Sequence, residues 1–432
     1  MKALHRSASI ATLAGLVVAL TGIFAAAGNV KAAGSTVGNG SASSCTEAAL
    51  RSAVASGGPI TFNCGNNATI ALTQALTITA DTDLDGKGKV TLDGQGNTRL
   101  VHVSTGVKFS TEKIALINGS AKSSDGAGNG AGLWNEGGDV TLTDTTIDAG
   151  SADHDGAAIY NQDGTLMLMR TTLSNGQAKG DGGALYVEKG TVTLGNVTVS
   201  GNVATGNGGG LFNAGGAVKV INVTFYKNEA SGDGRDVYES DGQIMLSNTI
   251  IANPALKPTD RATLTNCKDV TVGNNAGKNI MDGGHNLQYP EKSCGDGIMM
   301  GNPRLSVLGD YGSYTKTHAL FIGSLAIDRG SAAVCEAAPI SRLDQRQVER
   351  PDGDARGSVS CDIGAYEVVP APPTPVPVPT LTPVPQISYP NNPPSNNPPH
   401  NNPPPKNPPP PPPFSCPPGM YPIGNPPHCV VG

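Results

Sequence analysis

The sequence predicts an all-β protein whose body is a parallel β-helix, a single-stranded solenoid of stacked coils. Two observations predict this fold. A pattern of glycine, aliphatic and hydroxyl residues recurs every 26 residues, and each period contains three short runs in which apolar residues alternate. Three short strands cannot bury an apolar face alone, so stacked copies must share one continuous core. A β-sandwich also has many short strands, but it would not repeat three of them at a fixed period.

The period is clearest between residues 130 and 255, where equivalent residues fall into columns. One column is aromatic and contains Trp134, Tyr160, Tyr186, Phe212 and Tyr238. An apolar column contains Leu142, Leu168, Leu194, Val220 and Leu246. We expect like residues to stack about 4.8 Å apart, the spacing of hydrogen-bonded strands. At a bend between two strands, Asn196, Asn222 and Asn248 suit a left-handed backbone, and their amides could stack into a ladder.

Residues 1–33 have the features of a cleaved signal peptide. Lys2 and Arg6 precede an apolar run from Ile10 to Ala27, and small residues at its end suit cleavage. An uncleaved anchor is the alternative, because the run is nearly long enough to cross a bilayer. No second run of this length follows, so we expect a secreted or cell-surface protein with no membrane span in the mature chain.

Eight cysteines fall into four pairs that are local in sequence. Behind a signal peptide, an even number of cysteines indicates disulfides formed in an oxidising compartment. The predicted pairs are Cys45–Cys64, Cys267–Cys294, Cys335–Cys361 and Cys416–Cys429. The first pair brackets a short helical pattern within residues 34–65. We expect this segment to form an N-terminal cap that covers the open end of the solenoid.

The predicted β-helix extends over residues 66–367, and a different composition follows it. Residues 368–415 are rich in proline and asparagine, so they cannot build a core and should form a disordered, extended spacer. Residues 416–432 would close as a small loop through the last cysteine pair. The net charge is -6 and only 15% of residues are charged, with no basic block outside the signal. Nucleic acid is therefore not an expected partner.

The end of the predicted β-helix, about residues 282–367, contains a series of specific motifs. These are Asn302-Pro303, Gly312, Thr317 to Leu320, Ala326 to Asp328, Gly330, Asp344-Gln345-Arg346, Arg350-Pro351 and Cys361 to Glu367. Together they resemble the choice-of-anchor Q domain, with departures at Leu325, Arg329 and Gln347. The repeats upstream resemble those of pectin-lyase-like β-helices. The resemblance implies a right-handed β-helix that is secreted or attached to a surface, and it implies no particular activity.

Few residues stand out as candidates for a site. The adjacent aspartates and the Gly-His-Gly of polygalacturonase-like enzymes are absent, and Gly284-His285-Asn286 is better explained as a turn. A column of turn residues includes Asp155, Asp181 and Asp233, which suit either backbone capping or Ca²⁺ binding. The aromatic column suits either packing or stacking on a glycan. The sequence identifies no cofactor. If the protein binds a metal ion, the acidic column would suit Ca²⁺.

The sequence therefore predicts a β-helix protein with a structural, adhesive or polysaccharide-binding role and no recognisable catalytic site. Its expected partners are extracellular polysaccharide or the cell envelope. The alternative is a polysaccharide lyase or a glycoside hydrolase. The two hypotheses differ in geometry, because an enzyme needs two or more acids and a cation in one groove, whereas a binding protein needs a flat stripe without that cluster.

Overall fold

The computed structural model describes residues 33–125, 127–254, 265–270, 279–350 and 360–369, together with two strands near the C-terminus. The chain divides into two units, residues 1–372 and 373–432. In the second unit, β32 (Met420–Ile423) pairs with β33 (His428–Val431) in antiparallel fashion. The predicted signal peptide, nearly all of the proline-rich spacer and the Cys416–Cys429 pair lie outside the residues whose side chains are described.

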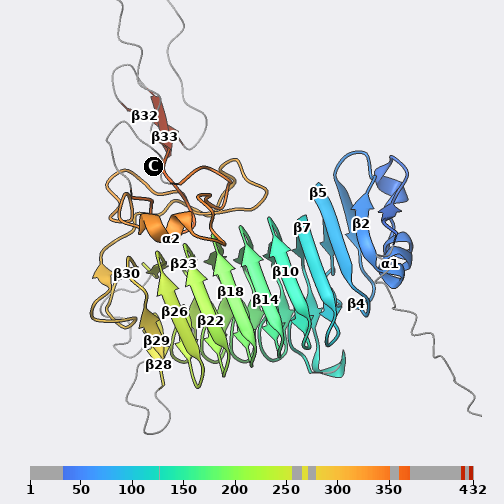
Figure 1. The fold of residues 1–432 in the computed structure, drawn as a ribbon, viewed down its shortest axis with the longest axis horizontal. Coiled ribbons are helices and arrows are strands. Elements are labelled where there is room, and N and C mark those ends of the chain that lie inside the picture. Colours follow the sequence, from blue (N-terminus) through green and yellow to red (C-terminus); the bar gives the residue numbers. More distant parts are fainter. Residues whose placement is uncertain are drawn as a thin grey trace, which may run out of the picture. The chain divides into compact units, whose positions relative to one another are not determined.

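The first unit is the predicted parallel β-solenoid, in which successive coils lie side by side along one axis (Figure 1). A regular coil contributes one strand to an eight-stranded sheet, two strands to an 18-stranded sheet, here called the long sheet, and one two-residue strand to a five-stranded sheet. In one such coil these strands are β13 (Ile159–Asn161), β14 (Thr165–Met169), β15 (Thr172–Ser174) and β16 (Gln177–Ala178). Their partners in the next coil are parallel to them.

The remaining strands continue these three sheets. The eight-stranded sheet also contains β4 (Leu76–Ile78), β6 (Val101–Val103), β9 (Leu133–Asn135), β17 (Leu185–Val187), β21 (Leu211–Asn213), β25 (Val237–Glu239) and β28 (Cys267–Asp269). The five-stranded sheet also contains β8 (Ser120–Ala121), β12 (Ser151–Ala152), β20 (Val203–Ala204) and β24 (Glu229–Ala230). The long sheet also contains β1 (Ser35–Val37), β2 (Gly58–Phe62), β3 (Ala68–Ala71), β5 (Thr82–Asp93), β7 (Lys108–Ile117), β10 (Asp139–Thr143), β11 (Thr146–Asp148), β18 (Thr191–Gly195), β19 (Thr198–Ser200), β22 (Ala217–Ile221), β23 (Thr224–Tyr226), β26 (Gln243–Ser247), β27 (Ile250–Ala252), β29 (Ile280–Asp282), β30 (Leu287–Tyr289) and β31 (Met299–Met300).

Residues 26 apart lie side by side in the regular coils. In the long sheet Leu166 pairs with Val192, and Leu168 pairs with Leu194. These side chains are at most 1% exposed and alternate with outward residues, so they belong to a core that is continuous from coil to coil. Burying each such aliphatic side chain contributes about 1.5–3 kcal/mol. The predicted solenoid and its stacked apolar columns are confirmed.

The bends between the two strands of the long sheet have a left-handed backbone. The φ angle is +53° at Asn196, +52° at Asn222 and +48° at Asn248, as the sequence predicted for asparagine at this position. The amide ladder is largely replaced by other contacts. Asn248 Nδ2 lies 3.4 Å from Asn222 Oδ1, but Asn196 Nδ2 donates to Leu343 O at 2.7 Å and Asn222 Nδ2 to Cys335 Sγ at 3.4 Å. The bend amides therefore bind a later segment of the chain.

The N-terminal segment covers the first coils of the solenoid with α1 (Glu47–Ser56), preceded by a short 3-10 helix (Ala42–Ser44) (Figure 1). Thr46 caps α1, because its side chain accepts the N–H of Ala49 at 3.2 Å. Leu50 and Val54 point into the core and are 0% and 5% exposed. A disulfide joins Cys45 to Cys64, and a second joins Cys267 to Cys294 near the other end. Both pairings are those that the sequence suggested.

The prediction that the β-helix continues to residue 367 is wrong. The last strand of the solenoid is β31, and the described residues between 301 and 369 contain one regular element, the short α2 (Ala332–Glu336). This segment, called the C-terminal layer below, turns back along the coils and covers their flank (Figure 1). The physical reason is that the apolar columns end near residue 300, while the outward residues of β15 and β19 are threonines and serines whose buried hydroxyls require polar partners.

Candidate functional site

The aromatic column lies outside the core, on the outer face of the eight-stranded sheet, where each ring sits between two inward residues of its strand. The ring centroids are 4.8–5.1 Å apart and the ring planes lie within 12° of parallel along Tyr160, Tyr186, Phe212 and Tyr238. Trp134 stacks in the same way on His102, at 4.4 Å. The ring faces therefore cover one another and are not free to stack on a sugar. This geometry supports packing and does not support a glycan platform at these five residues.

Burial and nearby carboxylates keep the tyrosines of this column protonated. Burial, followed by the charges of Asp155, Asp181 and Glu188, raises the pKa of Tyr186 to about 12. Burial also raises the pKa of Tyr160, whose hydroxyl donates to Glu188 Oε2 at 2.6 Å. Neither phenol is poised to act as a base near neutral pH.

The acidic column caps backbone groups. Asp155 Oδ1 accepts the N–H of Asp181 at 2.7 Å, and Asp181 Oδ1 accepts the N–H of Asn207 at 2.6 Å. The N–H of Asp233 donates to Asn207 Oδ1 at 2.9 Å, and the Asp233 carboxylate forms an ion pair of 3.3 Å with Lys268. Among the residues that the structure describes, no group of three or more histidines, cysteines, aspartates or glutamates is placed to hold a metal ion. The capping explanation fits Asp155 and Asp181, Asp233 pairs with Lys268, and a Ca²⁺ site in this column is not supported.

The C-terminal layer binds the flank of the coils through buried polar side chains. Gln345 Oε1 accepts the hydroxyl of Thr198 at 2.6 Å, and its Nε2 lies 3.0 Å from Thr172 Oγ1. His318 Nδ1 donates to Ser306 O at 2.8 Å, and its Nε2 lies 2.9 Å from Ser200 Oγ. Burial lowers the pKa of His318 to about 4. Two neighbouring coils are therefore fixed to the layer by matched donors and acceptors.

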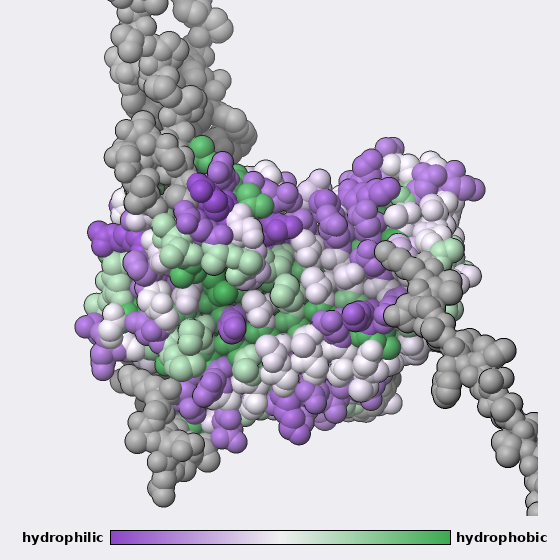
Figure 2. Space-filling model, viewed as in Figure 1, coloured by the Kyte–Doolittle hydropathy of each residue, from purple (hydrophilic) through white to green (hydrophobic). Residues whose placement is uncertain are grey.

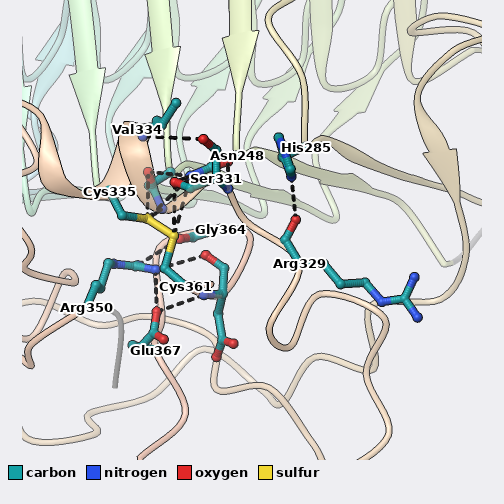
Figure 3. The surroundings of a disulfide bond; sticks show 12 residues. Asn248, His285, Arg329, Ser331, Val334, Cys335, Arg350, Cys361, Gly364 and Glu367 are labelled. Carbon is teal, nitrogen blue, oxygen red and sulfur yellow. Dashed lines mark hydrogen bonds and ion pairs between the residues drawn. A yellow bond between two sulfur atoms is a disulfide. The ribbon is translucent and has the colours of Figure 1, made fainter. Parts of the chain in front are cut away.

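A buried ion pair holds the end of the layer together. Arg350 and Glu367 are both 0% exposed, and Arg350 Nη1 lies 2.8 Å from Glu367 Oε2. Arg350 also donates to the carbonyl oxygens of Asp362 and Gly364, at 3.0 and 2.8 Å. Figure 3 shows this arginine beside Cys361, which forms the third disulfide with Cys335. Arg350 and Glu367, two charged residues of the terminal motifs, therefore have a structural role.

A hollow of about 360 Å³ lies where the layer meets the last strands of the solenoid. Its polar lining comes from two segments that are distant in sequence, with Asp282 at the end of β29, His285 in the turn that follows, and Asp328 and Arg329 in the layer. The volume lies near the lower end of the range for small-molecule sites. His285 and Asp328 both have φ of +56°, a left-handed backbone that non-glycine residues seldom adopt.

The orientation of His285 in this hollow is fixed by one hydrogen bond (Figure 3). Its Nδ1 donates to the carbonyl oxygen of Arg329 at 2.8 Å, because a carbonyl can only accept. In the neutral ring, Nε2 then carries the lone pair and can accept a proton or a hydrogen bond. Asp282 Oδ1 accepts from Gly284 N and Asn286 Nδ2, so this carboxylate also stabilises the turn that holds His285. The turn that the sequence predicted at His285 is thus correct. The sequence analysis did not predict the hollow that this turn lines.

A second surface is the part of the long sheet that the layer leaves uncovered, here called the open face. It consists of the outward residues of β10, β14, β18, β22 and β26. Its middle column contains Thr141, Met167, Thr193, Lys219 and Met245. Met167 and Met245 are 38% and 41% exposed. Figure 2 shows apolar side chains gathered over these strands, beside the C-terminal layer.

The comparison with protein families agrees with this architecture. Residues 129–291 match the family model described as the right handed beta helix region. The matched coils therefore form a right-handed parallel β-helix. No curated protein and no solved structure matches the chain significantly. Among the described residues, no helix is long and apolar enough to cross a bilayer.

Proposed function

We propose that the protein is an extracellular scaffold that binds polysaccharide along the open face and does not cleave it. The observation that carries this proposal is the open face itself, a stripe on which partly exposed threonines lie among the exposed side chains of Met167, Lys219 and Met245. Threonine hydroxyls can donate to and accept from sugar hydroxyls, and methionine contacts adapt to irregular apolar patches. Lys219 adds a cation that can pair with the carboxylate of an acidic polymer.

Two further observations support a role outside the cell. Three disulfides close the cap, the end of the coils and the C-terminal layer, and such bonds persist in oxidising compartments. The terminal motifs resemble a module of secreted or surface-attached β-helix proteins, and the proline-rich segment that follows would serve as a spacer. Attachment to the cell envelope is therefore part of the proposal.

Binding is tested by pull-down of neutral and acidic polysaccharides, with and without Ca²⁺, together with an assay for released reducing or unsaturated ends. The double variant Met167→Glu/Met245→Glu places two charges on the open face. We expect it to lose binding at least about tenfold, because charge removes the apolar contacts. The control Val203→Glu changes a residue of similar exposure, 39%, on the five-stranded sheet and should bind as the unmodified protein does. Equal binding by both variants would contradict the proposal.

An enzymatic function is the second candidate, because the hollow combines a histidine of fixed orientation with two aspartates and an arginine. In that case His285 would act as the base and Arg329 would bind an anionic group of a polysaccharide substrate. The enzymatic function would be supported, and the scaffold proposal contradicted, if the purified protein releases reducing or unsaturated ends. This release should be abolished in His285→Gln and kept in the control His154→Gln. Binding without release supports the scaffold.

A further inference from the structure

A ring of buried polar residues closes the interior of the last regular coil, away from the surfaces discussed above. Asn228 Nδ2 donates to Asp236 Oδ1 at 2.8 Å, and Asn253 Nδ2 donates to Asn228 O at 2.5 Å. The main-chain N–H of Asn253 and the Nδ2 of Asn266 both donate to Tyr289 O, at 3.0 and 2.7 Å. The N–H of Asp236 donates to Asn266 O at 2.9 Å, which completes the ring.

Within the described part of the chain, three side-chain oxygens of this ring have no hydrogen-bond partner, namely Asp236 Oδ2, Asn253 Oδ1 and Asn266 Oδ1. The three residues are 0%, 1% and 0% exposed. Asp236 and Asn266 directly precede the register pair Val237 and Cys267, so they stack in neighbouring coils. Buried acceptors are almost always paired, so three of them in one ring require an explanation.

The three side-chain atoms of the ring that lack a partner are all oxygens, and the one carboxylate among them is fully buried. Burial raises the pKa of Asp236 to about 7, and among nearby charges Arg235 lowers it while Glu291 raises it. One carboxylate with two amide oxygens is a ligand set suited to a hard cation, and amide oxygens are ordinary Ca²⁺ ligands.

We propose that Asp236 Oδ2, Asn253 Oδ1 and Asn266 Oδ1 bind one calcium ion inside the solenoid. This site is separate from the acidic turn column, where Asp155 and Asp181 already accept backbone N–H groups and Asp233 pairs with Lys268. Three protein ligands leave the remaining positions to water, and the single charge limits affinity to a Kd of about 10⁻⁴–10⁻³ M, as in extracellular calcium modules. The ion would tie β25 to β28, at the point where the 26-residue period ends.

The test is thermal unfolding of the full chain in EDTA, in MgCl₂ and in CaCl₂ at about 5 mM, several-fold above the expected Kd. Calcium should raise the Tm by about 2 °C or more, and magnesium should not. Asp236→Asn keeps the shape and removes the charge, so it should abolish the calcium-dependent rise. The matched control Asp181→Asn, in the turn column, should keep it.

Equilibrium dialysis with calcium provides a second measurement on the unmodified protein, in case Asp236→Asn does not fold. One ion bound per chain supports the site, and no bound calcium overturns it. A calcium-dependent rise in Tm that persists in Asp236→Asn also overturns it. A Tm that falls as the pH rises through about 7, with no response to calcium, would show that a proton on Asp236 satisfies the ring instead.

Discussion

The regular coils and the C-terminal layer achieve stability in opposite ways. In the coils the same packing contact is repeated, because each inward residue stacks on its equivalent 26 residues away and adds to one apolar core. In the layer hardly any contact is repeated, and buried polar groups such as Arg350, Gln345 and His318 are each satisfied by a different set of partners. The comparison teaches that the solenoid tolerates local change through redundancy, whereas the layer depends on individual side chains.

The largest effect is expected from Arg350→Met. This change removes the cation from Glu367, which is fully buried, and leaves the carbonyls of Asp362 and Gly364 without a donor. Breaking one side of a buried ion pair costs about 3–5 kcal/mol of unfolding free energy. Urea unfolding measures this loss of unfolding free energy, and limited proteolysis detects release of the layer from the coils.

Arg342→Gln is the matched control for that variant. Arg342 lies in the same layer but is half exposed, at 3.9 Å from Glu336 and 3.6 Å from Glu349. Exposed ion pairs of this kind contribute about 0–1 kcal/mol, so the unfolding free energy should change little. Similar losses in both variants would show that the layer does not depend on its buried pair.

A second prediction concerns the redundancy of the coils. Leu194→Ala removes a fully buried side chain and should lower the unfolding free energy by about 3 kcal/mol, through lost burial and the cavity that remains. Leu168→Ala and Leu246→Ala change the equivalent residue of other coils, and both are also fully buried. The three losses in urea unfolding should agree within about 1 kcal/mol, because the surroundings repeat. A wide spread would mean that the coils are not equivalent.

The same contrast explains what could be predicted from the sequence. The coils were predicted because their contacts recur at a fixed spacing, which is visible as columns of letters. The layer was not, because its contacts join residues far apart, such as Gln345 to Thr172 over 173 residues and His318 to Ser200 over 118. The terminal motifs were visible in the sequence, but nothing in them showed that they fold back on the coils.

The candidate sites were predicted less well than the fold, for a physical reason. The aromatic column was found by its period, but only the structure shows that its ring faces cover one another. His285 was read correctly as a turn residue, yet the hollow needs Asp328 and Arg329, which arrive from the layer. The ring around Asp236 was missed because an isolated buried aspartate leaves no periodic signal.

A third prediction uses pH to act on the layer through His318. In the unfolded chain its pKa is about 6.5, and burial lowers it to about 4 in the folded protein. Between these values the unfolded state binds more protons, so stability falls as the pH decreases from about 6.5 toward 4. At pH 4.5 the loss attributable to His318 is roughly 2–3 kcal/mol.

Comparison with His318→Gln isolates this contribution. Asp362, in the same layer, has a pKa raised to about 6 by burial, so its contribution to stability increases as the pH falls. This contribution is present in both the unmodified protein and the variant, so it cancels in the comparison. Urea unfolding at pH 7.5 and 4.5 should show a greater loss for the unmodified protein than for the variant. An identical pH dependence would mean that His318 remains neutral or exposed in both states.

The smallest loss of unfolding free energy is expected at the aromatic column. Its rings repeat from coil to coil as the core residues do, but they lie on the outer face of the sheet, outside the core. Tyr186→Ala removes one ring between Tyr160 and Phe212 and two stacking contacts of about 0.5–1.5 kcal/mol each, so the unfolding free energy should fall by about 1–3 kcal/mol. Tyr186→Phe keeps the ring and should cost much less. Polysaccharide pull-down should be unchanged in both variants, because the ring faces are already covered. If Tyr186→Ala loses binding while Tyr186→Phe retains it, the aromatic column rather than the open face is the surface that contacts the polymer.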